Sequence, residues 1–174
     1  QQAISKIGFG VLNKIFLQFP SKFWGESDQI GYASEDGQFF LFYDMSKVTG
    51  VPIIMTLVPG SRGEAMESAS DQDIVAMVLE RLRSLFQAQS LAAPTKYKIT
   101  RWRSDPYAKG SYSYLSPAAT WTDMQQLQQS VHGRLFFAGE ATIPKFNAST
   151  HGAFMSGIER ARMIREVLRP SKRR

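Results

Sequence analysis

Three short apolar segments constrain the fold of this 174-residue chain more than any other feature. They are Leu12–Phe19, Gln38–Met45 and Val51–Gly60. The second and third are nearly continuous apolar runs, which is typical of strands that are covered on both faces. We therefore expect these two segments to lie at the centre of a β-sheet. The chain is long enough for one good-sized domain, or for pieces of two domains.

The segment Leu12–Phe19 alternates, and this alternation predicts a strand with two different faces. Ile15, Leu17 and Phe19 share the apolar face, whereas Lys14 belongs to the other face. One interpretation of Lys14 is a surface or edge residue of the sheet. The other is a buried cation with a partner or a task, because burying an unpaired charge is costly. Both interpretations stay open.

Ser70 marks the start of a predicted helix, because it can cap the helix and an acidic residue follows three positions later. Apolar residues then recur at helical spacing to about Gln87. Pro170 is expected to block the continuation of the last helix. The other predicted elements are a strand at Lys96–Trp102, a short buried strand at Arg134–Ala138, and helices near Thr122–Gln129 and at Ser149–Leu168.

Strands and helices alternate along the chain without a strict βαβ rhythm. We therefore predict an α+β fold, or mixed α/β fold, with a mixed sheet. The segment Gly8-Phe9-Gly10 is a near match to the start of the dinucleotide-binding fingerprint. However, Asn13 stands at the third glycine position, and a strand rather than a helix follows. The chain therefore contains no obvious Rossmann βαβ start.

Composition excludes several kinds of site. The absence of cysteine excludes disulfides, thiol nucleophiles, zinc–thiolate sites and a cysteinyl link to a cofactor. The two histidines, His132 and His151, are not near a cluster of other ligands, so we predict no metal site. No apolar run approaches the roughly 18 residues of a membrane span, and we expect no membrane partner.

Positive charge is concentrated near the C-terminus. Residues 159–174 contain seven Lys or Arg and two Asp or Glu, so +5 of the net charge of +6 lies there. A solvated helix face, with cations suited to a helix C-terminus, is one explanation. The other is a basic tail, at residues 171–174, that contacts nucleic acid or chromatin.

The segment Leu135–Gly157 combines a carboxylate with a helix start made of small residues. Glu140 follows an apolar run, and its carboxylate can accept hydroxyl hydrogen bonds from a sugar or polyol. Ser149 and Thr150 are candidates for the helix N-cap, and a helix N-terminus favours an anion. Either a ligand or a tightly packed sheet can explain the stripe of small residues that follows, and both stay open. The stripe consists of Ala153, Gly157 and Ala161.

The segment Arg101–Tyr114, RWRSDPYAKGSYSY, is dense in aromatic and cationic residues. One interpretation is a strand end followed by a loop that Trp102 anchors. The other is a wall of aromatic rings that can stack on a planar or cationic ligand.

Three motifs together resemble a known enzyme family. FFAGEAT, followed by S-T-H-G-A-F-x-S-G-I-x-x-A, resembles the C-terminal flavin-binding segment of the FAD-dependent amine oxidases. GFGVLNKIFLQF and RWRSDPYAKGSYSY match the same family in the right order. The similarity covers roughly residues 8–168 and looks closest to the branch of lysine-specific histone demethylases and polyamine oxidases. It implies that residues 1–122 belong to the substrate-binding domain and residues 123–170 to the FAD-binding domain.

The resemblance also implies a reaction. A hydride passes from the carbon beside an amine nitrogen to the flavin, the imine is hydrolysed, and oxygen is converted to hydrogen peroxide. The expected amine is a methylated lysine or a polyamine. Monoamine oxidases carry a cysteine where this chain has Ser111, so the FAD is expected to be bound without a covalent link.

The resemblance assigns roles to residues in the first two motifs. Lys14 matches the catalytic lysine that holds a water beside the flavin. Trp102 and Tyr107 match aromatic residues beside the flavin, although demethylases tend to have tryptophan at the position of Tyr107. Tyr112 matches one wall of the aromatic cage that receives the substrate amine.

The third motif supplies the remaining matches. Gly139 and Glu140 match the segment that binds the ribityl or ribose region of FAD. Ser149 and Thr150 match the helix start that faces the flavin ring, where the helix dipole stabilises negative charge. Ser149 also replaces a second cage aromatic, which implies a more open substrate site.

In this family the dinucleotide-binding unit lies far upstream, and it is absent from these residues. We therefore expect a piece of a longer protein that pairs with the rest of the amine-oxidase chain, binds FAD poorly alone and is inactive alone. The alternative is a non-catalytic, amine-oxidase-like binding module whose basic tail contacts nucleic acid, chromatin or a partner protein. The expected location is intracellular, in the nucleus or cytoplasm.

Overall fold

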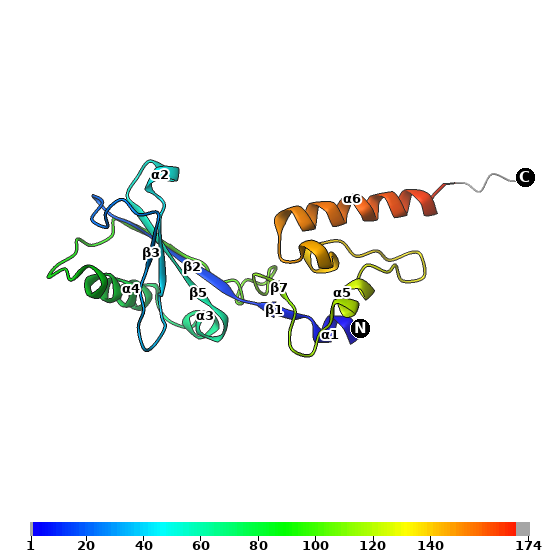
Figure 1. Cartoon of the computed structure of the whole chain (residues 1–174), viewed down its shortest axis with the longest axis horizontal. Coiled ribbons are helices and arrows are strands. Elements are labelled where there is room, and N and C mark those ends of the chain that lie inside the picture. The colour runs from blue at the N-terminus through cyan, green and yellow to red at the C-terminus, as the bar shows by residue number, and fades with distance from the viewer. Residues whose placement is uncertain (1, 170–174) are drawn as a thin grey trace, which may run out of the picture. The chain divides into compact units, whose positions relative to one another are not determined.

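The computed structural model describes residues 2–169 (Figure 1). Two compact units are present, and each is described by itself. Residues 11–111 form the sheet unit, and residues 2–10 with 112–169 form the α6 unit, named after its helix α6 (Thr150–Val167). Pro170 and the basic tail at residues 171–174 lie outside the described residues. The predicted division into substrate-binding and FAD-binding domains at residue 122 concerns ligands and stays a prediction.

The sheet unit contains five strands in the order β3-β4-β5-β2-β6. The two nearly continuous apolar runs form β4 and β5, which lie inside the sheet as predicted, and β5 is its central strand. The strands are β2 (Leu12–Gln18), β3 (Gln29–Gly31), β4 (Leu41–Asp44), β5 (Ile53–Pro59) and β6 (Lys96–Ile99).

The α+β class is confirmed, but the sheet is not mixed, because each of its strand pairs is antiparallel. The connection between β4 and β5 shows one reason. Residues 45–52 are too few for the crossover that a parallel pair needs, so these neighbouring strands form an antiparallel hairpin.

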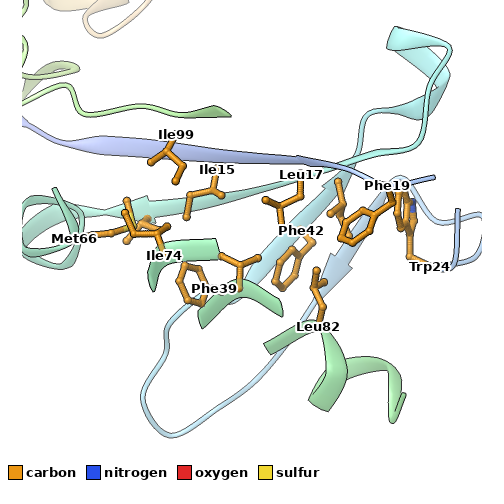
Figure 2. Packing of buried hydrophobic residues seen from close by; sticks show 13 residues of the cluster. Ile15, Leu17, Phe19, Trp24, Phe39, Phe42, Met66, Ile74, Leu82 and Ile99 are labelled. Carbon is orange, nitrogen blue, oxygen red and sulfur yellow. The ribbon is translucent and has the colours of Figure 1, made fainter. Parts of the chain in front are cut away.

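The helix α4 (Asp71–Phe86) packs its apolar side chains against the buried side of this sheet (Figures 1 and 2). Ser70 is its N-cap as predicted, since the Ser70 hydroxyl accepts a hydrogen bond from the backbone N–H of Asp73 at 3.1 Å. The buried side chains of α4 are Ile74, Val78 and Leu82. Two shorter helices complete the sheet unit, α2 (Ser46–Thr49) and α3 (Gly60–Met66).

The strand β2 has the two faces that its alternation predicts. Ile15, Leu17 and Phe19 are at most 1% exposed and belong to the apolar core. Lys14 lies on the opposite face of the strand and is partly buried. The core face also contains a polar residue, Asn13, which is fully buried.

The α6 unit includes a small antiparallel pair, β1 (Gly8–Gly10) with β7 (Tyr112–Tyr114). A Cβ atom on Gly8 would lie 2.3 Å from the ring of Tyr114, so glycine is needed there to make room for that ring. This contact explains Gly8 without a phosphate. The other elements are α1 (Gln2–Lys6), α5 (Trp121–Gln126), α6 and two single 3₁₀ turns, η1 (Glu140–Thr142) and η2 (Pro144–Phe146).

The predicted buried strand at Arg134–Ala138 is wrong. Leu135 forms one isolated bridge with Val131 and is 52% exposed, and no further strand pairing extends along the segment within the described residues. An apolar run becomes a buried strand only where a neighbouring strand accepts its backbone hydrogen bonds. The predicted helices near residues 122–129 and 149–168 are confirmed as α5 and α6. Between residues 2 and 169, no helix is both long and apolar enough to cross a membrane.

Candidate functional site

Lys14 is held in the sheet unit by its neighbour Thr100. The Lys14 backbone N–H donates to the Thr100 hydroxyl at 2.7 Å, and the Lys14 carbonyl accepts the Thr100 N–H at 3.0 Å. The Lys14 ammonium forms no hydrogen bond or ion pair with the residues that the structure describes. The backbone is therefore fixed, while the partly buried cation remains available to a ligand or a water.

Trp102 is tied to the same strand through Asn13. The Asn13 side-chain oxygen accepts the Trp102 backbone N–H at 3.0 Å and the Thr100 hydroxyl at 3.2 Å. Lys14 and Trp102, which the sequence separates by 88 positions, therefore share the Asn13 and Thr100 contacts. Asn13 and Thr100 were not predicted as site residues.

A carboxylate completes this arrangement at the end of α3. The Glu67 side chain accepts hydrogen bonds from the Asn13 amide at 2.7 Å and from the Arg103 backbone N–H at 2.9 Å. It also accepts the Ser104 backbone N–H at 2.7 Å and the Ser104 hydroxyl. The segment that carries Trp102 is thus fastened on both sides, by Asn13 and by Glu67.

Tyr107 lies in the loop that follows and is 96% exposed. The carboxylate of Asp105 shapes this loop, since it accepts the backbone N–H groups of Ala108 at 2.7 Å and Tyr107 at 2.8 Å. These two bonds, with Ala108 the stronger cause, hold the pKa of Asp105 below its usual range. The Tyr107 ring has no packing role in the sheet unit and is free to stack on a ligand.

Glu140 is the centre of the α6 unit's candidate site. Its carboxylate accepts the Ser113 backbone N–H at 2.9 Å, the Ser113 hydroxyl at 2.7 Å and the Ala148 backbone N–H at 2.7 Å. Ser113 follows Tyr112, and Ala148 precedes Ser149, so Glu140 joins the two predicted substrate-contacting positions. A carboxylate has about four acceptor sites, so three internal bonds leave one for a polyol hydroxyl.

Gly139, the residue before Glu140, has a φ of 138°, which favours glycine. Its N–H donates to the Ser156 hydroxyl at 2.8 Å, and that hydroxyl donates to the Ala153 carbonyl at 2.7 Å. Ser156 is fully buried and was not predicted as a site residue. A Cβ on Gly139 would meet no atom within 4 Å, so the space beside Gly139 is open.

The small-residue stripe of α6 is not its packed face. A Cβ on Gly157 would meet no atom within 4 Å, and Ala161 is exposed. The buried face lies one residue earlier and consists of Gly152, Ser156 and Arg160. Gly152 is the tight position, because its Cβ would lie 2.1 Å from the Phe146 carbonyl oxygen.

Ser149 is the N-cap of α6. Its hydroxyl accepts the Gly152 N–H at 3.1 Å and donates to the Phe146 carbonyl at 2.6 Å. The first N–H groups of the helix, including that of Thr150, have no intrahelical partner and carry partial positive charge. This end of an 18-residue helix is suited to an anionic group.

The predicted site residues thus form two sets. Lys14, Trp102 and Tyr107 lie in the sheet unit, where shared contacts bring the first two together. Tyr112, Gly139, Glu140, Ser149 and Thr150 lie in the α6 unit, where Glu140 and the α6 N-terminus connect them. Among residues 2–169, no group of three acidic, histidine or cysteine side chains is arranged to hold a metal ion.

Comparison with known proteins gives consistent results. The model of a family described as flavin containing amine oxidoreductase matches residues 1–165. The chain is 41% identical to lysine-specific histone demethylase 1 homolog 1 of Arabidopsis thaliana, over 97% of this chain and 21% of that protein. It is 40% identical to protein FLOWERING LOCUS D of the same plant, over 91% of this chain and 21% of that protein.

A fungal relative shows similar coverage. Histone demethylase-like protein A of Aspergillus fumigatus is 37% identical, over 97% of this chain and 17% of that protein. The chain therefore spans about a fifth of the length of the curated relatives it matches.

Proposed function

The chain belongs to the flavin-containing amine oxidoreductase family, and we propose that it forms part of an enzyme that oxidises a C–N bond of a methylated lysine or a polyamine. The family implies a flavin cofactor. We propose that this flavin is FAD, bound without a covalent link, because the chain has no cysteine. The serine at the expected linkage position, Ser111, instead accepts the backbone N–H of Leu12 at 2.8 Å.

The α6 unit fits part of such a cofactor. Glu140 keeps an acceptor site for a ribityl or ribose hydroxyl, and the space beside Gly139 is open. Ser149 and Thr150 present the positive end of α6, which stabilises negative charge on a ring placed there. The partly exposed ring of Tyr112 offers a face to a cationic amine. These residues would hold the cofactor and orient the amine.

The observation that carries the proposal is the state of Lys14. A partly buried lysine with a fixed backbone and no internal ion pair is costly unless it has a task. A flavin held there would supply the oxidation, by taking up a hydride from the carbon beside the amine nitrogen; water would then hydrolyse the imine, and oxygen would be reduced to hydrogen peroxide. Lys14 would hold and orient the water by donating a hydrogen bond from Nζ. Trp102, which is fixed to the same strand, would form one side of the pocket that holds this water.

The relatives support the substrate class and the location. Two of them are described as lysine-specific histone demethylase homologues or histone demethylase-like, which favours a methylated lysine over a polyamine and a nuclear location. Since the chain spans about a fifth of these proteins, we propose that the rest of a longer chain completes the flavin site.

Replacing Lys14 tests the proposal in the longest natural chain that contains these residues. We expect Lys14→Met to retain bound flavin but to lose about 100-fold or more of the turnover measured by peroxide formation, because the water is no longer oriented. The matched control is Lys98→Met, which removes an exposed lysine from the neighbouring strand β6.

Two results would contradict the proposal. Unchanged turnover in Lys14→Met would remove Lys14 from the reaction. A flavin-loaded wild-type chain with no turnover on either a methylated-lysine peptide or a polyamine would favour the non-catalytic binding module.

A further inference from the structure

Asn13 is a fully buried amide next to Lys14, on the core face of β2. Burying an amide is costly unless its hydrogen bonds are made. The Asn13 side-chain NH₂ group donates to the Gly63 carbonyl at 3.1 Å and to the Glu67 carboxylate at 2.7 Å, and its oxygen accepts two further bonds. The amide therefore makes four hydrogen bonds, which a hydrophobic residue of the same size could not replace.

Two of these bonds lie just beyond the end of the regular ladder between β2 and β6. The register of β2 with β6 ends at Ile15 opposite Ile99. Beyond that point, the Thr100 hydroxyl accepts a hydrogen bond from the Lys14 N–H, and the side-chain oxygen of Asn13 accepts one from the Trp102 N–H. One backbone bond, from the Thr100 N–H to the Lys14 carbonyl, also remains there. The side chains of Thr100 and Asn13, together with this bond, therefore set where Lys14 and Trp102 lie with respect to each other.

Glu67 serves as an acceptor for four donors, two of them from Ser104. Burial alone would raise the pKa of the Glu67 carboxyl. The hydrogen bonds that it accepts, with the bond from Asn13 the largest, outweigh burial and hold the pKa below its usual range. Glu67 is thus ionised at neutral pH and accepts with both oxygens.

We propose that Asn13 and Glu67 are positioning residues, whose amide–carboxylate pair fixes the Trp102 segment to β2 and so keeps Lys14 and Trp102 in one rigid frame for amine oxidation. This inference rests on the proposed function. Neither side chain need touch substrate or flavin. Asn13 and Glu67 act through the residues they hold, as does Thr100.

The chemistry of the pair suggests a nearly isosteric test. In Glu67→Gln, one oxygen becomes an NH₂ group that faces either the Asn13 amide and Arg103 N–H or the N–H and hydroxyl of Ser104. In either orientation, the new NH₂ group faces hydrogen-bond donors, so the bonds to that side of the Glu67 side chain are lost. The matched control is Glu64→Gln on the same helix, where the carboxylate is 44% exposed and pairs with the Arg103 guanidinium at the surface.

Two readouts on the longest natural chain separate positioning from simple stability. Amide hydrogen exchange at Trp102, Arg103 and Ser104 is expected to be about tenfold faster in Glu67→Gln than in wild type, and unchanged in Glu64→Gln. The rate constant of flavin reduction at saturating amine is expected to fall about tenfold, with flavin content unchanged. Glu67→Asp, which keeps the charge, is expected to lose less in both readouts, and it serves as the second variant if Glu67→Gln does not fold.

Each outcome decides the inference. Unchanged exchange in Glu67→Gln overturns the rigid frame, whatever the chemistry does. Faster exchange with an unchanged rate constant overturns the catalytic consequence. If wild type shows no amine-dependent flavin reduction, the proposed function is wrong, and so is the inference that Asn13 and Glu67 affect amine oxidation. The exchange data still decide whether Asn13 and Glu67 hold the Trp102 segment.

Discussion

The two units of this chain are stabilised in different ways. The sheet unit has a continuous hydrophobic cluster of thirteen buried side chains between its sheet and α4 (Figure 2). In the α6 unit, the buried apolar side chains among the described residues are few, and two of them are alanines; they are Ala3, Ala119, Met124 and Ile143. Its segments are connected instead by partly buried polar contacts, such as those of Glu140, Ser156 and Asp123.

The helix α6 makes the contrast clear. Phe154 is 71% exposed and Val167 is 59% exposed, so an apolar part of this helix is not covered by the described residues. The sheet unit thus owes its fold mainly to hydrophobic burial, whereas the α6 unit depends on a few specific polar contacts. The proposed roles match this difference, because Glu140 and Ser149, which we propose contact the cofactor, are themselves part of the contacts that hold the α6 unit together.

The largest expected effect comes from the hydrophobic core. Leu82 is fully buried in α4, and Leu82→Ala should destabilise the sheet unit by about 2–5 kcal/mol through lost burial and a cavity. Hydrogen exchange resolved by segment should show faster exchange in β2 and β5 with little change in the α6 unit. Met77→Ala, at an exposed position of the same helix, is the control, and an equal loss in both units would contradict the comparison.

A smaller, pH-dependent effect is expected in the α6 unit. The Asp123 carboxylate accepts hydrogen bonds from Lys6 Nζ at 2.9 Å and from the Thr120 N–H and hydroxyl at 2.9 and 2.8 Å. Lys6 first, and then Thr120, lower the pKa of Asp123 from an ordinary 3.8 to about 2. Because the folded-state pKa is depressed, this stabilisation is complete at pH values above 3.8 and is lost as the pH falls through about 2.

Asp123→Asn tests this contribution. The variant should unfold its α6 unit more readily at pH 6, and its stability should change less between pH 5 and pH 2 than that of wild type. Asp28→Asn is the control, because Asp28 pairs with Lys47 at the surface of the sheet unit with both side chains more than half exposed. The same acid dependence in wild type and Asp123→Asn would show that Asp123 does not stabilise the α6 unit.

Local patterns in the sequence predict the parts of the fold that local physics determines. The alternation of Leu12–Phe19 correctly assigns Ile15 to the core and Lys14 to the other face, because strand side chains alternate strictly. Ser70 and Ser149 are both N-caps in the structure, since capping depends on residues within one turn.

Predictions that depend on distant partners are less successful. The apolar run at Arg134–Ala138 predicts a strand, but pairing requires a neighbour that the run itself does not reveal. The stripe at Ala153 and Gly157 is one residue away from the buried face, because a helix rich in small residues offers several stripes at similar spacing. The contact between Asn13 and Glu67 joins residues 54 positions apart and has no local signal.

The predicted roles of the site residues have a similar limit. Lys14 and Glu140 stand out because each places a charge beside an apolar strand or run, and the structure shows how their backbones and contacts are fixed. Their proposed action on a flavin depends on a bound ligand, which no pattern within the sequence describes.

The flavin absorption spectrum after gel filtration tests the central claim most directly, with this 174-residue chain and the longest natural chain purified in parallel. In our proposal, the α6 unit contributes part of a flavin site through Glu140, Ser149 and Thr150, and no Rossmann start is found among these 174 residues. We therefore expect the longer chain to retain the flavin absorption band and the 174-residue chain to lose it. A longer chain without a flavin band, or a 174-residue chain that retains the band equally well, would contradict this account.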